Sequence, residues 1–323
     1  MTPVHFLWPR PKPLRALVQA ARFTAITRIE AQLSEMFPSG TPVLFSSGRT
    51  ALIHALLFSG LLRNDKVGVF PYASHCVLDL VSRVATPTAV GSDARLNVIF
   101  QQWGYAQHHD LSLQDIEDSV DSLLTPGAKL FRGGGGFDLW SLPKILGTTG
   151  GGVLWCRTGK IASTLRQLRD DRKRSNFLLW ALRLLGIRSA FLYACWQGAE
   201  ASFGRPSRLQ TGEILAALSE WNDVVTDRQN KLNIAWQLAP NWLSKPVDRL
   251  PCVVPVELRS DVDGEALAKQ IGIASGLRWM ECPLESGGFE LTQVLPIPIH
   301  QDVSFARLNA IINCIAPLVR SER

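Results

Sequence analysis

Residues 42–62 have the sequence PVLFSSGRTALIHALLFSGLL, in which a short apolar run leads through a small polar turn into a longer apolar segment. The run at 42–45 predicts a buried strand, and the segment at 50–62 predicts a helix. The same pattern returns with a strand at 67–70 and a helix at 74–84. Strands that alternate with helices in this way are typical of an α/β fold with a mainly parallel sheet.

The rest of the chain continues this pattern and then changes. Further strands are predicted at 86–90, 97–101, 113–118 and 151–156, and helical spacing is found at 15–36, 158–200 and 209–236. From residue 237 a proline-marked linker leads to strands at 253–258 and 295–299 and to helices at 264–272 and 303–318. We therefore predict a large domain over residues 1–236, with an extended arm at 1–14, and a small α+β domain over residues 237–323.

Composition places the chain among ordinary globular proteins. It has 323 residues and a net charge of +6 without a long basic run, so we expect no nucleic acid partner. The six cysteines are scattered without zinc-ligand spacing, which indicates reduced thiols in a cytoplasmic protein and no metal site. The N-terminal stretch lacks an apolar signal core, and no run of about 18 uncharged apolar residues predicts a membrane-spanning helix.

Polar residues follow several of the predicted strands. The segments 46–48, 71–75 and 117–118 each come after a strand, and ligands of open α/β sheets bind beyond the carboxyl ends of the strands. The turn at 46–48 also opens a helix, whose free amides and dipole suit a phosphate group. A plain serine N-cap fits the same turn.

Lys144 has the most specific surroundings. It lies in the sequence FDLWSLPKILG at 137–147, with three glycines at 150–152 and the acidic pair Glu117-Asp118 upstream. A lysine that forms a Schiff base, and an aspartate that keeps a pyridine nitrogen protonated, are what a pyridoxal phosphate (PLP) enzyme requires. Taken singly, such residues are more often a solvated lysine and a solvated acidic pair, so the prediction depends on the ordered set.

These motifs resemble those of the DegT/StrS sugar aminotransferases, which are PLP enzymes with the aspartate-aminotransferase fold (fold type I). The resemblance covers about residues 25–315. It is carried by SSGRTAL at 46–52, PYASHC at 71–76, IEDS at 116–119, SLPK at 141–144 and LPIPIH at 295–300. The two motifs that contain Asp118 and Lys144, in this order, are its most specific part.

The resemblance implies a role for several residues. Lys144 would carry PLP and move protons, and Asp118 would bind the pyridine nitrogen. The remaining implied cofactor contacts are Gly48, Arg49, Thr50 and Ser141 to the phosphate and His75 stacked on the ring. The implied protein is a homodimer that moves an amino group from an amino acid, glutamate or glutamine, to a keto nucleotide sugar.

Some positions depart from the family pattern. Arg49 replaces a usual threonine, and Asp121 stands where glutamine or histidine usually contacts the phenolic oxygen of PLP. A carboxylate there would repel that oxygen unless it were protonated or turned away. The family's loop asparagine is not evident, and Arg205 or Arg208 would take its place at the partner site. These departures leave open another PLP reaction, or a noncatalytic relative that serves as a partner subunit.

The segment at 172–196 is rich in basic and aromatic residues. It fits a helix that lies weakly on a membrane surface. A helix buried in a domain or dimer interface is the favoured interpretation.

Overall fold

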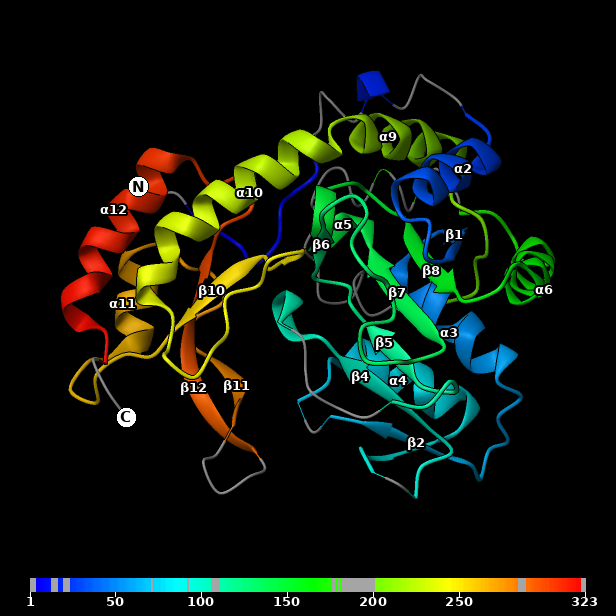
Figure 1. Cartoon of the computed structure of the whole chain (residues 1–323), viewed down its shortest axis with the longest axis horizontal. Helices are drawn as coiled ribbons and strands as arrows, with labels where there is room; N and C mark the ends of the chain where they lie inside the picture. Colours follow the sequence, from blue (N-terminus) through cyan, green and yellow to red (C-terminus); the bar gives the residue numbers. More distant parts are fainter. Residues whose placement is uncertain are drawn as a thin grey trace.

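The computed structural model describes residues 4–12, 17–19, 24–70, 72–91, 93–105, 111–175, 178, 181, 201–283 and 289–320. A large sheet with its helices forms one part of the molecule, and a small sheet with its own helices forms the other (Figure 1). The helices α9 (Arg208–Ser219) and α10 (Trp221–Ala235) run one after the other across both parts.

The large sheet has seven strands in the order β1-β8-β7-β5-β4-β2-β3. Their bounds are β1 Thr41–Phe45, β2 Lys66–Val69, β3 Thr86–Ala89, β4 Leu96–Phe100, β5 Ile116–Asp118, β7 Phe137–Ser141 and β8 Gly152–Cys156. The strands from β7 to β3 pair in parallel, and β8 is antiparallel to both of its neighbours. The predicted α/β fold with a mainly parallel sheet is confirmed.

Side chains that alternate along each strand supply a separate core to each face of the large sheet. Leu44 and Trp140 belong to the core that also contains residues of α2 (Ile26–Met36), α9 and α10. Their neighbours Val43 and Leu139 belong to the opposite core, under α3 (Gly48–Phe58), α4 (His75–Val84) and α6 (Gly159–Asp170). The large sheet is therefore covered by helices on both faces, as parallel sheets require.

The small sheet is antiparallel, in the order β10-β12-β11. Its strands are β10 Val253–Val256, β11 Arg278–Pro283 and β12 Phe289–Pro298, with the helices α11 Gly264–Gln270 and α12 Phe305–Ile315. A pairing of β6 (Leu123–Leu124) with β9 (Arg249–Leu250) joins the chain that follows β5 to the chain that enters the small sheet. The N-terminal arm lies against this part, since His5 bridges Ile273 and Leu7 packs with Cys252.

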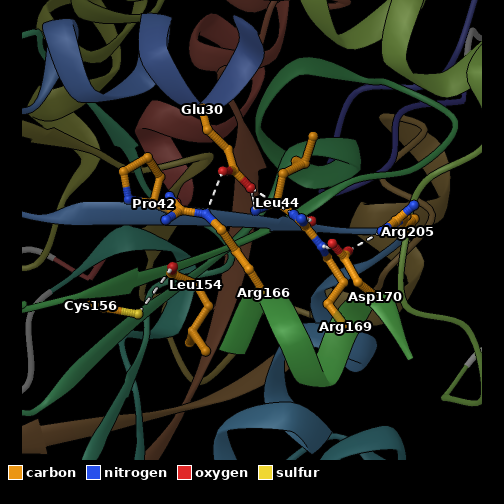
Figure 2. Close-up of polar contacts among 9 residues, drawn as sticks. All are labelled: Glu30, Pro42, Leu44, Leu154, Cys156, Arg166, Arg169, Asp170 and Arg205. Carbon is orange, nitrogen blue, oxygen red and sulfur yellow. Dashed lines mark hydrogen bonds and ion pairs between the residues drawn. The ribbon is translucent and has the colours of Figure 1, made fainter. Parts of the chain in front are cut away.

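Side chains cover the outer edge of β1, where the large sheet ends (Figure 2). Glu30 from α2 accepts a hydrogen bond from Leu44 N at 2.9 Å, and Arg169 from α6 donates to the Leu44 carbonyl at 2.9 Å. Arg166 donates to the Pro42 carbonyl at 3.0 Å. Glu30 also pairs with Arg166 at 2.8 Å and with Arg169 at 2.7 Å. These bonds satisfy backbone groups of an edge strand that would otherwise be open to pairing with another chain.

Several predicted elements differ from the observed ones. The single helix predicted at 209–236 is divided into α9 and α10 at Glu220, whose backbone (φ −101°, ψ 7°) departs from helical geometry. The helix predicted at 50–62 ends at Phe58, and the strand predicted at 113–118 is confined to β5. The strands β7 and β11 have no predicted counterpart.

The basic-aromatic segment at 172–196 falls mostly outside the described residues, which include only 172–175, 178 and 181 of it. Its two interpretations therefore stay predictions. Of the helical stretch predicted at 158–200, the helix α6 is observed. In the described part of the chain, no helix combines the length and the apolar composition needed to cross a membrane.

Candidate active site

The candidate site lies at the carboxyl ends of β1, β5 and β7. Asp118 is the last residue of β5, Ser141 is the last residue of β7, and Lys144 follows in the short helix α5 (Leu142–Leu146). β1 leads through a serine turn into α3. A methyl group on Gly48, the first residue of α3, would lie 3.4 Å from Ser141 Cβ. The turn before α3 and the end of β7 are thus in contact.

Lys144 forms an ion pair with the fully buried Asp121. Its Nζ lies 3.0 Å from Asp121 Oδ1 and 4.5 Å from the centre of the Trp8 ring. Burial alone would lower the pKa of Lys144, but the charges of Asp121 and Asp118 outweigh it and raise the pKa above its ordinary value. Lys144 is therefore an ammonium at neutral pH, and it must release a proton before its amine can act as a nucleophile.

Asp118 is a buried acid with little to stabilise its charge. It is 4% exposed, and its Oδ1 accepts one long hydrogen bond, at 3.4 Å, from Val120 N. Burial raises the pKa of Asp118 to about 7, an effect that Lys144 opposes and Asp121 strengthens. A carboxyl group in this state would be stabilised by a cationic hydrogen-bond donor, and a protonated pyridine nitrogen is such a donor.

The turn between β1 and α3 is built from small hydroxyl side chains. Ser47 caps α3, because its Oγ accepts from Thr50 N at 3.1 Å, and the hydroxyls of Ser46 and Ser47 lie 2.9 and 3.0 Å from Thr50 Oγ1. The serine N-cap weighed from the sequence is thus present. β8 begins against this turn, since a methyl group on Gly152 would lie 2.2 Å from the Ser47 carbonyl oxygen. The turn and the start of β8 therefore fix one another.

Two buried side chains hold the backbone that follows Lys144. Arg228 from α10 donates from Nη2 to the Ile145 carbonyl at 3.0 Å, and Glu213 from α9 accepts from Thr149 N at 2.9 Å. Arg228 is fully buried, and burial lowers its pKa to about 10. These contacts from two long helices fix the position at which α5 presents Lys144.

Two candidate residues are less closely joined to this set. His75 begins α4 with an exposed side chain, and among the described residues no hydrogen bond or ion pair links that side chain to Lys144 or Asp118. Arg205 Nε pairs with Asp170 at 2.6 Å, beside α6 (Figure 2).

Two neighbours of Lys144 had no role predicted from the sequence. The thiol of Cys76, the residue after His75, is one of the groups that raise the pKa of Lys144. Trp8 reaches Lys144 from the N-terminal arm. No local pattern marks Trp8, because its position depends on an arm that folds back across the molecule.

Comparison with known proteins identifies the class to which this site belongs. A sequence model of the family described as "Putative PLP-dependent aminotransferase" matches residues 29–316. The chain belongs to this family and is a PLP-dependent aminotransferase. A search of curated proteins gave no match.

Several solved structures share the fold. DesV of S. venezuelae is 16% identical, with 96% of this chain and 98% of that chain covered and a TM-score of 0.65. A DegT DnrJ EryC1 StrS aminotransferase of Brucella abortus is 15% identical over 94% and 95%, with a TM-score of 0.63. PseC of Helicobacter pylori, an aminotransferase involved in the biosynthesis of pseudoaminic acid, is 11% identical over 96% and 98%, with a TM-score of 0.63. At these identities the likeness shows the fold, which is the predicted fold type I.

Proposed function

We propose that this chain transfers an amino group from an amino acid, glutamate in the first instance, to the keto group of a nucleotide sugar. The observation that carries the proposal is the meeting of Lys144 with the buried acids Asp118 and Asp121 at the ends of neighbouring strands. The sugar class is taken from the structural neighbours, of which PseC acts in the biosynthesis of pseudoaminic acid. It also agrees with the DegT/StrS motifs in the sequence.

The residues of the site fit PLP. When bound, PLP supplies an aldehyde that bonds to a lysine amine and a ring that accepts electrons from the substrate carbon. We assign the bond to Lys144, and we assign the pyridine nitrogen to Asp118, whose buried carboxyl accepts a hydrogen bond from Val120 N and from no cationic donor among the described residues. The phosphate is assigned to the first turn of α3, at Gly48, Arg49 and Thr50, together with Ser141.

The chain's own groups account for proton movement at Lys144. Asp121 Oδ1, at 3.0 Å from Nζ, can accept the proton that the ammonium must lose before it reacts, and can return it when water leaves. Once the amine is released, the same Nζ can carry a proton to or from the substrate carbon. We assign His75, the first residue of α4 and the neighbour of Cys76, to stacking on the face of the PLP ring.

We further propose that the enzyme works as a cytoplasmic homodimer. The large domain at 1–236 would hold PLP and the small domain at 237–323 would help to enclose the substrate. Arg205 or Arg208 would then contact the phosphate in the partner's site.

A panel assay tests the proposed reaction. Purified protein with PLP and glutamate should convert a keto nucleotide sugar to its amino form and release 2-oxoglutarate, and Lys144→Ala should do neither. Exchange of the α-hydrogen of glutamate without any sugar amination would show that the chain carries out another PLP reaction. Neither exchange nor amination by a protein that binds PLP would contradict the proposal and indicate a noncatalytic relative.

A further inference from the structure

Asp121 is a buried acid whose negative charge is balanced by the ammonium of Lys144. It is fully buried, and apart from the ion pair at 3.0 Å neither carboxylate oxygen has a hydrogen-bond partner among the described residues. The other titratable or charged groups that act on this pair are Asp118 on β5, Cys76 on α4, Arg228 on α10 and Cys252 before β10. The ammonium of Lys144 is the cation in direct contact with Asp121, so a second negative group brought beside this nitrogen would leave the buried carboxylate without a balancing charge.

Attachment of PLP changes that contact. The Nζ of Lys144 bonds to the aldehyde carbon, the aldehyde oxygen leaves as water with two of the three ammonium protons, and the nitrogen keeps the third. The phenolic oxygen of PLP is bonded to the ring carbon next to the one that bears the aldehyde. In the bound protein it would therefore lie near Nζ, within reach of the carboxylate that pairs with Nζ. Two ionised oxygens at such a site repel one another strongly.

We propose that Asp121 takes up one proton from solvent when PLP bonds to Lys144, and that the protonated carboxyl then donates a hydrogen bond to the phenolic oxygen. This inference rests on the proposed function, because it requires Lys144 to be the lysine that bonds PLP. It explains how an acid can stand where the DegT/StrS pattern has glutamine or histidine, which are donors without this proton uptake. Asp121 thus makes cofactor attachment in this chain depend on pH.

The sign of the pH dependence follows from linkage. A proton taken up on binding makes the affinity for PLP rise as the pH falls, by up to about tenfold per pH unit. Asp121→Asn keeps the size of the side chain but cannot titrate. The part of the pH dependence that Asp121 contributes should therefore be absent from this variant, while the contribution of Asp118 is kept in both proteins.

Calorimetric titration of cofactor-free protein with PLP, in buffers of different ionisation enthalpy, counts the protons taken up. We expect the wild type to take up about one proton more than Asp121→Asn at neutral pH. Asp115→Asn is the matched control, because Asp115 is also buried but accepts hydrogen bonds from Asn97 N and Ser112 N. The control should take up as many protons as the wild type.

Equal proton counts for the wild type and Asp121→Asn would overturn the inference. If Asp121→Asn does not fold, Asp121→Gln serves in its place, because neither amide can ionise. Failure of the proposed function gives a different result: borohydride reduction of the wild type would then leave no PLP on Lys144. That outcome removes the inference together with the assignment of Lys144, whereas equal proton counts with PLP on Lys144 remove the inference alone.

Discussion

Replacing Asp118 by asparagine should remove a loss of folding stability that the cofactor-free protein undergoes as the pH rises. The pKa of Asp118 rises from 3.8 to about 7 on folding, because the residue is buried. The folded state then holds the proton more firmly than the unfolded state, so stability falls as the pH rises between these values and is level above them. One pKa unit corresponds to about 1.4 kcal/mol, and the wild type should lose about 3 kcal/mol between about pH 5 and about pH 8. Asparagine cannot ionise, so the variant should gain about 3 kcal/mol on the wild type over this range.

Urea unfolding of cofactor-free wild type and Asp118→Asn at the two pH values measures this difference. Asp79→Asn is a suitable control, because Asp79 lies in an exposed pair with Arg83 and should follow the wild type. With PLP bound, the wild type should become the more stable of the two proteins, since asparagine cannot stabilise a protonated ring nitrogen. PLP should therefore raise the Tm of the wild type more than that of the variant. A difference between the two free energies of unfolding that is the same at both pH values would refute a raised pKa for Asp118.

Two further substitutions test how the site and the sheet edge are held. Gly152→Ala would place a methyl group 2.2 Å from the Ser47 carbonyl oxygen, whereas the methyl group of Gly159→Ala would meet open space. Gly152→Ala should therefore weaken PLP binding at least about tenfold, and Gly159→Ala should not. Equal PLP affinities of the two variants in a fluorescence titration would count against the contact. Glu30→Gln removes the buried charged partner of Arg169 at the edge of β1. It should lower the free energy of unfolding in urea by about 3–5 kcal/mol. A loss below about 1 kcal/mol would show that these contacts contribute little to stability.

The parts of the fold that the sequence predicted are those with a local cause. The alternation of short apolar runs with helical segments is read from neighbouring residues, and it gave β1, β2 and the helices that follow them. Asp118 could be selected because it stands at the end of such a run, and Lys144 could be selected because it lies in a specific motif. The prediction of an α/β sheet with a lysine and an acid at its carboxyl edge needed no knowledge of distant contacts.

The missed features depend on residues far apart in the chain. β7 contains Asp138, a charged residue that is unusual inside a central strand, and it is stabilised there by Arg249 at 2.8 Å, 111 positions away. Trp8 reaches Lys144 only because the N-terminal arm folds back across the molecule. From its place in the sequence, Asp121 was also expected to repel the cofactor unless it were protonated or turned away. That expectation stays a prediction, and the structure adds that Asp121 forms an ion pair with Lys144.

The most direct test of the central claim is to find where PLP attaches. The holoenzyme is reduced with borohydride and digested, and the peptide that carries the pyridoxyl group is identified by mass spectrometry. We predict a single modified residue, Lys144, and the loss of this label in Lys144→Ala. A label on another lysine, or no label in a protein saturated with PLP, would contradict the assignment of the site.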